Sequence, residues 1–226
     1  MIGGAGRGRW PARVHRADAG ISLAELLVTM MVFAILMAIT SGFMVSAMRA
    51  SAQARTIDES TRAATTAMTA VTRNLRAGTD NPVAGVTLPA PAFETAAGNE
   101  IVFYAYVNLA SAEASPIKVR YWLDGRALKE TTTASRRSAD GFFTFTGAAS
   151  TRTLATSVVP GPDLFTFVGA TGADLPLAGL ATDVAKRQIA AVRVRVQVGP
   201  SATSPAATTL VNTVGLPNLD IARTLP

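Results

Sequence analysis

Hydrophobic residues dominate one long stretch near the start of the chain. From Ile21 to Met48 the sequence carries no charged side chain except Glu25. A helix over these 28 residues is about 42 Å long at 1.5 Å per residue, whereas the hydrocarbon core of a bilayer is about 30 Å thick. The pattern therefore predicts a membrane-spanning helix over residues 21–48.

Beyond Met48 the hydrophobic residues thin out to a narrow stripe. Small or apolar side chains recur at spacings of four and three, at Ile57, Thr61, Ala64, Met68, Val71 and Leu75. The charged residues of this stretch lie off the stripe, which is the pattern of an amphipathic helix. Gly78, followed by Asp80, Asn81 and Pro82, is typical of a helix end. We predict one helix from Ile21 to about Ala77, with residues 49–77 as its amphipathic, extracytoplasmic part. From the spacing alone, the stripe fits either packing on the chain's own domain or a coiled-coil seam.

After Gly78 the pattern changes to short runs with β propensity, separated by Gly, Pro, Asn and Ser. The predicted strands are Ile101–Val107, Ile117–Asp124, Arg126–Thr133, Phe142–Thr146, Leu164–Val168, Ile189–Val198 and Thr208–Val214. Asp124 and Gly125 predict a tight hairpin. Valines alternate with polar residues from Val192 to Val198, which predicts one buried and one exposed face. We expect loops at Pro160–Asp163, Gly169–Ala185 and Gly199–Ala207.

Composition and charge narrow the class of protein. The 226 residues are enough for one anchor and one domain, and they include no Cys, which excludes disulfides and zinc–thiolate sites. The formal net charge of +6 is concentrated in a leader that holds Arg7, Arg9, Arg13 and Arg16 against Asp18. Removing residues 1–20 leaves 17 basic and 14 acidic side chains, too small an excess to indicate nucleic acid. The leader arginines fit retention on the cytoplasmic side.

The most specific motif lies where the leader meets the apolar run. Gly20 to Met30 reads GISLAELLVTM, with Gly20 before an apolar residue, Ile21, and a carboxylate, Glu25, at the fifth position after the glycine. This motif resembles the cleavage and methylation signal of type IV prepilins. Ile21 stands where the family usually has Phe, and Ala24 where it often has Ile or Val. Ser22 and Glu25 also form a capping box, S-x-x-E, which by itself would only start a helix; the two interpretations are compatible.

The resemblance implies a fold and a maturation route. It implies an α+β, pilin-like fold in which the long helix packs on an antiparallel β-domain (78–226), and it therefore favours packing of the stripe on that domain over a coiled coil. Prepilin peptidase would cut after Gly20 and methylate the new amino terminus of Ile21. Glu25 would then pair with the Ile21 ammonium of a neighbouring subunit; the alternative partner is its own terminus, one turn away.

Size, strand content and lack of Cys resemble minor rather than major pilins, in particular the J-type minor pseudopilins and W-type minor pilins. The resemblance implies a structural subunit of a type IV pilus or a type II secretion-like fibre, held in the cytoplasmic membrane by a single span. Its β-domain would be extracytoplasmic, or at the cell surface or fibre tip after assembly. Its partners would be prepilin peptidase and other pilin or pseudopilin subunits. A secretory signal has a shorter apolar region, and a plain single-pass anchor gives Glu25 no role. The sequence does not choose among secretion, motility, adhesion and competence machines.

The residue inventory argues against an enzyme. The one histidine, His15, lies in the leader, so mature-chain sites that depend on His or Cys are excluded. We interpret Glu94, Glu100, Glu113 and Glu130 as solvated surface carboxylates. No metal or other cofactor is expected, because Asp163, Asp174, Asp183 and Asp220 are too widely spaced for a calcium loop.

A DNA-binding surface is the remaining alternative, for a competence pilus. Lys118 and Arg120 share one face of a predicted strand, and Arg193 and Arg195 share one face of another. No aromatic residues interleave with them, as they do in platforms that bind single strands. Charges of this kind more often protect a sheet face or edge, and nucleic acid is therefore not an expected partner.

Overall fold

The structure, a computed structural model, describes residues 20–108 and 115–219. It divides into two compact units, residues 1–50 and 51–226. The first unit holds the start of the helix α1 (Leu23–Arg76), and the second holds the rest of α1 and all the strands. The predicted leader (1–20) lies outside the described residues except for Gly20.

The helix α1 is continuous through both apolar and amphipathic sequence, as predicted. It passes through Thr40, Ser41 and Gly42 without a break. It ends at Arg76, one residue before the predicted end, where the Gly78 N–H donates to the Leu75 carbonyl at 2.9 Å. A Cβ on Gly78 would lie 2.9 Å from that same carbonyl, so this closing turn has little room for a side chain.

The second unit contains a five-stranded antiparallel sheet in the order β1-β2-β3-β4-β7. Its strands are β1 (Phe93–Ala96), β2 (Glu100–Asn108), β3 (Ser115–Asp124), β4 (Ala127–Ala134) and β7 (Ala149–Ala155). The predicted hairpin joins β3 to β4 through Gly125 and Arg126, and Asp124 pairs with Ala127. Gly125 has φ +59°, the conformation that a type II′ turn requires of its first central residue.

A second antiparallel sheet has the order β11-β10-β8-β9. Its strands are β8 (Phe165–Gly169), β9 (Asp174–Leu175), β10 (Ile189–Val198) and β11 (Thr208–Gly215). Two further short strands, β5 (Arg136–Arg137) and β6 (Phe143–Thr144), pair with each other. A 3-10 turn, η1 (Leu177–Gly179), and a short helix, α2 (Asp183–Lys186), precede β10. In β10 the valines are buried and Arg193, Arg195 and Gln197 are partly exposed, as the alternation predicted.

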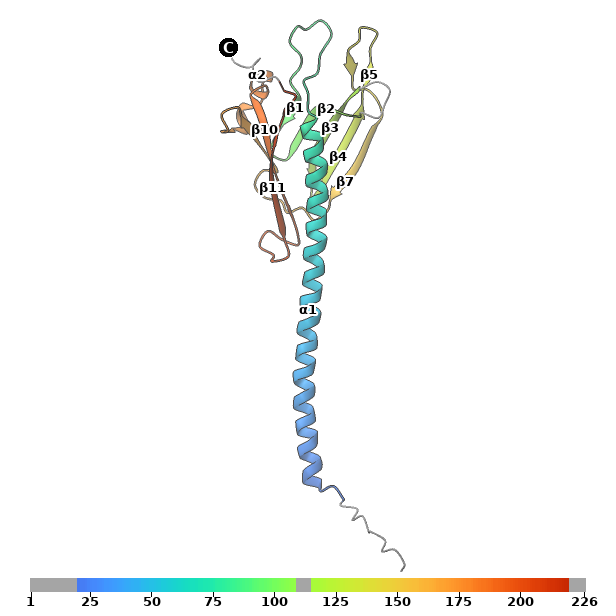
Figure 1. The fold of residues 1–226 in the computed structure, drawn as a ribbon, viewed down its shortest axis with the longest axis vertical. Coiled ribbons are helices and arrows are strands. Elements are labelled where there is room, and N and C mark those ends of the chain that lie inside the picture. Colours follow the sequence, from blue (N-terminus) through green and yellow to red (C-terminus); the bar gives the residue numbers. More distant parts are fainter. Residues whose placement is uncertain (1–19, 109–114, 220–226) are drawn as a thin grey trace, which may run out of the picture. The chain divides into compact units, whose positions relative to one another are not determined.

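The second part of α1 packs on this β-domain, with β11 on one side and β4 and β7 on the other (Figure 1). The predicted stripe is buried at Ala64, Met68, Val71 and Leu75, within one core that includes Phe93, Phe103 and Phe167. The prediction of an α+β, pilin-like fold is therefore confirmed. Ile57 is 38% exposed and Thr61 is also exposed, so the stripe is covered only from Ala64 onward.

Several predicted elements were wrong in detail. The sequence interpretation missed β1, β5 and β7. The predicted strand Phe142–Thr146 contains only the two-residue β6, and the predicted loop Gly169–Ala185 contains β9, η1 and the start of α2. These segments bury few large side chains, so they give little periodic signal.

Candidate functional site

The N-terminal end of α1 is built by the residues of the motif. The Ser22 hydroxyl accepts a hydrogen bond of 3.1 Å from the Glu25 N–H, and the Ser22 carbonyl accepts one of 3.0 Å from the Leu26 N–H. Ser22 therefore caps the helix, and Glu25 lies in the first turn, where a carboxylate suits the helix dipole.

Two features of this end bear on maturation and assembly. Gly20 and Ile21 precede the helix, Ile21 is 72% exposed, and a Cβ on Gly20 would meet nothing within 4 Å. The Glu25 side chain is also exposed, and it makes no hydrogen bond or ion pair with any part of the chain that the structure describes. The bond between Gly20 and Ile21 is thus open to approach, and the carboxylate lacks a partner within the described chain.

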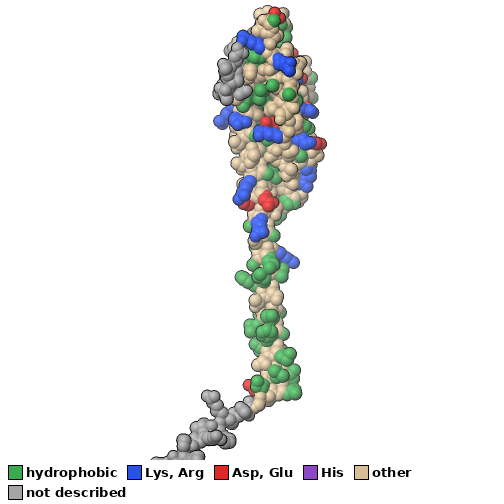
Figure 2. All heavy atoms as spheres, turned by 90° about the vertical axis from the view of Figure 1, so that its right-hand side faces the viewer, with side chains coloured by type: hydrophobic (Ala, Val, Ile, Leu, Met, Phe, Trp, Pro, Cys, Tyr) green, Lys and Arg blue, Asp and Glu red, His purple; other side chains and the backbone are tan. Residues whose placement is uncertain are grey.

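Every side chain of the apolar segment after Glu25 is exposed, and Figure 2 shows one face of this segment. Its most apolar window of 18 residues has a mean hydropathy of 2.3 and is 0% buried. Among the described residues, α1 is the one helix long and apolar enough to cross a membrane. A helix this apolar with no covering protein is suited to lipid or to other apolar helices.

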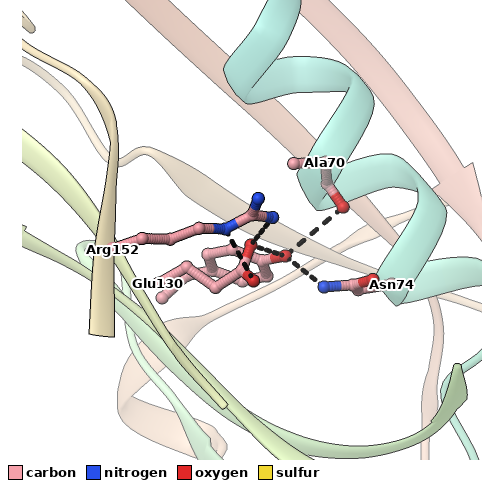
Figure 3. Close-up of polar contacts among 5 residues, drawn as sticks. Ala70, Asn74, Glu130 and Arg152 are labelled. Atoms are coloured by element: carbon pink, nitrogen blue, oxygen red, sulfur yellow. Dashed lines mark hydrogen bonds and ion pairs between the residues drawn. The ribbon is translucent and has the colours of Figure 1, made fainter. Parts of the chain in front are cut away.

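A second polar cluster lies in the other unit, between α1 and the five-stranded sheet (Figure 3). Tyr121 on β3, Glu130 on β4 and Arg152 on β7 are directly paired across three neighbouring strands. Arg152 donates to Glu130 from Nε at 3.2 Å and from Nη2 at 3.0 Å. The Tyr121 hydroxyl lies 3.1 Å from Glu130 and 3.3 Å from the Ala70 carbonyl, and accepts a bond of 2.7 Å from the Asn74 amide.

The electrostatics of this cluster follow from its burial. Glu130 is 4% exposed, so its carboxylate depends on Arg152 and Tyr121 for compensation. Burial, and then the Glu130 charge, raise the pKa of Tyr121 above its usual value, so the phenol stays protonated and can donate. The Glu130 carboxylate raises the pKa of the Arg152 guanidinium. The Asn74 Oδ1 is buried and has no partner among the described residues. Together these bonds tie α1 to the sheet.

The sequence interpretation of Glu130 as a solvated carboxylate was wrong. That interpretation rested on the scatter of the four glutamates through loops and strands, whereas the hairpin register places Glu130 opposite Tyr121 on the face toward α1. That register follows from the predicted turn and could have revealed the pair. Arg152 had no comparable signal, because β7 was not predicted.

Two other predicted surface carboxylates, Glu94 and Glu100, are partly exposed, unlike the buried Glu130. Glu94 lies 3.4 Å from Lys118 and accepts from the Tyr104 hydroxyl at 3.0 Å, and Glu100 pairs with Arg120 at 2.8 Å. Glu113 and Asp220 lie outside the described residues. Over residues 20–108 and 115–219, no three His, Cys, Asp or Glu side chains lie close enough to hold a metal ion.

The basic pairs considered for DNA are largely neutralised by carboxylates. Lys118 and Arg120 contact Glu94 and Glu100, Arg120 stacks 4.5 Å from the Trp122 ring centroid, and Arg193 pairs with Asp174 at 2.9 Å. Lys118, Arg120 and Arg193 therefore cross-link strands, whereas the partly exposed Arg195 has no ion pair among the described residues.

Comparison with known protein families finds a match that covers the motif at the start of α1. The family described as the prokaryotic N-terminal methylation motif matches residues 15–41, which include Gly20, Ile21 and Glu25. No curated protein matches the chain. The match supports a type IV pilin-like protein, processed by prepilin peptidase and held in the membrane by a single N-terminal helix. Proteins with this motif are structural subunits rather than enzymes, and the motif implies assembly with other pilin subunits.

Proposed function

We propose that this chain is a minor pilin or pseudopilin, a structural subunit of a type IV pilus or a type II secretion-like fibre. Residues 1–20 are the leader, 21–48 the membrane and assembly helix, 49–77 its amphipathic extension, and 78–226 the β-rich extracytoplasmic domain. The observation that carries the proposal is Glu25, a carboxylate without a partner among the described residues, at the start of an exposed apolar helix.

The chemistry of Glu25 explains why such a residue favours assembly. Cleavage after Gly20 would give Ile21 a cationic amino group, and a single charge at an apolar helix end is costly in a membrane. A cation and a carboxylate from neighbouring subunits offset each other when the helices have the correct axial register. Small residues at Ala34, Ala38, Gly42 and Ser46, four apart on this exposed helix, also suit close approach of apolar helices.

Intact mass of the membrane-extracted protein tests the proposed maturation. We expect a chain that begins at Ile21, lacks residues 1–20 and carries one added methyl group. Gly20→Arg should leave the precursor uncut, because the peptidase needs a small residue before the scissile bond. Ala17→Arg adds the same charge to the leader and should still be cut. A mature chain that begins after Met48 would contradict the proposal and indicate a secretory signal.

A second experiment tests the proposed role of Glu25. Glu25→Ala makes the segment more apolar, so insertion and processing should be normal. Co-purification with other pilin subunits from detergent extracts should fall strongly, with Glu25→Asp intermediate. Thr29→Ala is the matched control, since its hydroxyl only bonds the Leu26 carbonyl within the helix. Normal recovery of partners with Glu25→Ala would reduce Glu25 to a helix-capping residue and the chain to a plain membrane-anchored domain.

A further inference from the structure

The strand β7 is an open edge of the five-stranded sheet. The other edge strands of the two larger sheets are short or covered: β1 has four residues, β9 has two, and β11 is hydrogen-bonded to α1 through Thr208 and Asn212. By contrast, β7 has seven residues, and the first five of them are exposed. Within the part of the chain that the structure describes, its backbone pairs only with β4. The other side of β7 is therefore free to pair.

The sequence of β7 does little to block such pairing. In an antiparallel pair, alternate residues direct their N–H and C=O groups away from the partner strand, so about three residues of β7 offer these groups outward. The strand contains no Pro and no Lys, the residues that commonly protect an edge. Its one charged residue, Arg152, lies on the face toward α1, where it is bonded to Glu130. A charge on this face deters an apolar strand but favours one that carries an acid opposite it.

A basic groove lies beside this edge. The α1–β7 groove has a volume of about 340 Å³ and is lined by Thr65, Thr66, Thr69, Ala70, Arg73 and Arg152. The Arg152 side chain is 55% exposed, and Glu130 holds it through Nε and Nη2, which leaves Nη1 for another acceptor (Figure 3). Arg73 is exposed and has no ion pair within the described residues. The groove thus offers two guanidinium groups, and no acidic side chain lines it.

The charge around β7 indicates what kind of segment would bind there. Residues 126–155, from β4 to β7, contain five basic and two acidic side chains: Arg126, Lys129, Arg136, Arg137 and Arg152 against Glu130 and Asp140. Glu130 is buried and paired with Arg152, so it adds no exposed negative charge. Basic side chains predominate on this face of the unit (Figure 2). A second copy of β7 would bring its own Arg152 to the same face of the joined sheet, so an acidic partner fits better.

We propose that β7 accepts an extended acidic segment of a partner protein as a sixth strand, and that Arg152 and Arg73 bind a carboxylate of that segment in the α1–β7 groove. Side chains of the added strand alternate between the two faces, so its acid lies toward α1 and the adjacent residues lie beside Thr151 and Thr153. Main-chain hydrogen bonds supply affinity, and the acid selects the sequence. The inference goes beyond the proposed function and does not depend on it, because β7 and the groove belong to the second compact unit.

A labelled peptide tests the added strand. The probe is fluorescein-STVTETVTS-amide, and its fluorescence polarisation would be measured against the full chain in neutral detergent. Methylation of backbone nitrogens in the peptide removes donors without changing the protein. Only one side of an added strand bonds to β7, so methylation of one set of alternate residues should abolish binding, whereas methylation of the other set should leave it nearly unchanged. Equal effects of the two sets, or no binding of the unmodified peptide, would overturn the proposal.

Charge substitutions identify the groups that bind the acid. Arg73→Glu should weaken binding of the peptide roughly fivefold, because it replaces attraction with repulsion at an exposed position. A peptide with Lys in place of Glu should recover part of that loss. Arg55→Glu is the matched control, since Arg55 is exposed on the same side of α1 but 18 residues, or five full turns, before Arg73. Failure of the Lys peptide to bind Arg73→Glu better than it binds the wild type would contradict the pairing.

Mixed disulfides locate the bound peptide, because the chain contains no Cys of its own. A peptide with Cys in place of a Thr next to its Glu should cross-link to Thr151→Cys on β7. It should cross-link far less to Val211→Cys, an exposed position on the edge strand β11. A disulfide requires Cα atoms within about 7 Å, so the reaction reports the neighbouring strand. Equal or preferred trapping at Val211→Cys would place the peptide elsewhere and overturn the proposal.

Two further outcomes would assign β7 to a different occupant. If an oligothymidylate displaces the peptide and both methylated forms bind like the unmodified one, the groove binds phosphate groups rather than a strand, and the inference is wrong. If Thr151→Cys chains cross-link to each other in preference to the peptide, β7 pairs with a second copy, and the inference is also wrong.

Discussion

Tyr121 shows how one side chain joins two elements of the domain. Its hydroxyl accepts a hydrogen bond from the Asn74 side-chain amide of α1. The single proton of the hydroxyl has two available acceptors, the Glu130 carboxylate and the Ala70 carbonyl. The carboxylate is the stronger acceptor, because hydrogen bonds to charged groups are stronger than those to neutral ones. The phenol therefore stabilises the buried charge of Glu130, and its bond from Asn74 holds α1 against β3.

The raised pKa of Tyr121 predicts a loss of stability at alkaline pH. Its phenol has a higher pKa in the folded chain than the ordinary value of 10.0, as does that of Tyr104, so folding favours the protonated forms. The stabilisation is complete below about pH 10 and is lost as the pH rises further, because only the unfolded chain then ionises freely. We expect the Tm to fall more steeply above about pH 10 in the wild type than in Tyr121→Phe.

Tyr121→Phe should also cost about 1–3 kcal/mol at neutral pH, since it leaves the buried Asn74 amide without its acceptor. Tyr106→Phe, which removes the hydroxyl of a partly exposed tyrosine on β2, is the matched control. Parallel Tm curves for the wild type and Tyr121→Phe would refute the assignment.

At the scale of elements, the sequence predicted those helices and strands whose buried side chains recur at a regular period. The α1 stripe, the β3–β4 hairpin and the valines of β10 were predicted because apolar residues recur at the helical or strand period. By contrast, β7 reads ASTRTLA and is exposed over its first five residues, so its place in the sheet comes from pairing with β4 rather than from its own pattern. The Arg152 contact, and with it the α1–β7 groove, therefore could not be predicted from sequence.

The buried stripe of α1 gives a prediction at this scale. Met68 is 9% exposed, so Met68→Glu would bury a charge without a partner and should destabilise the domain by about 3–5 kcal/mol. Thr65→Glu, the same new side chain at an exposed position of the same helix, should change the stability by less than about 0.5 kcal/mol. Thermal unfolding of the full chain in detergent would measure both. Equal stability of Met68→Glu and the wild type would mean that α1 does not pack on the sheets.

At the scale of the whole molecule, the fragment Ser51–Pro226 should fold alone. It corresponds to the second compact unit and contains the complete core, in which the α1 stripe from Ala64 to Leu75 is covered by its own sheets. We expect a soluble monomer in sedimentation at micromolar concentration, because contacts between copies are weak once the anchors that concentrate them are removed. Self-association abolished by Met68→Glu would indicate an intermolecular seam instead.

The candidate functional residues fall into two groups: those that the sequence motif identifies, and those that only the fold brings together. Gly20, Ile21 and Glu25 lie within a contiguous motif, so their spacing was readable without a structure. The cluster of Asn74, Tyr121, Glu130 and Arg152 comes from one helix and three strands. Only the register of those strands brings its members together.

The attachment of α1 to the domain also has a mechanical consequence. The helix is tied to the strands at successive levels, by Thr61 to Thr208, Thr72 to Asn212 and Asn74 to Tyr121. Tension applied along α1 from its N-terminal side would shear these bonds together instead of peeling them one at a time. Because the bonds share the load, several of them must break at once before α1 separates from the strands. The domain therefore resists forces that pull on its helix.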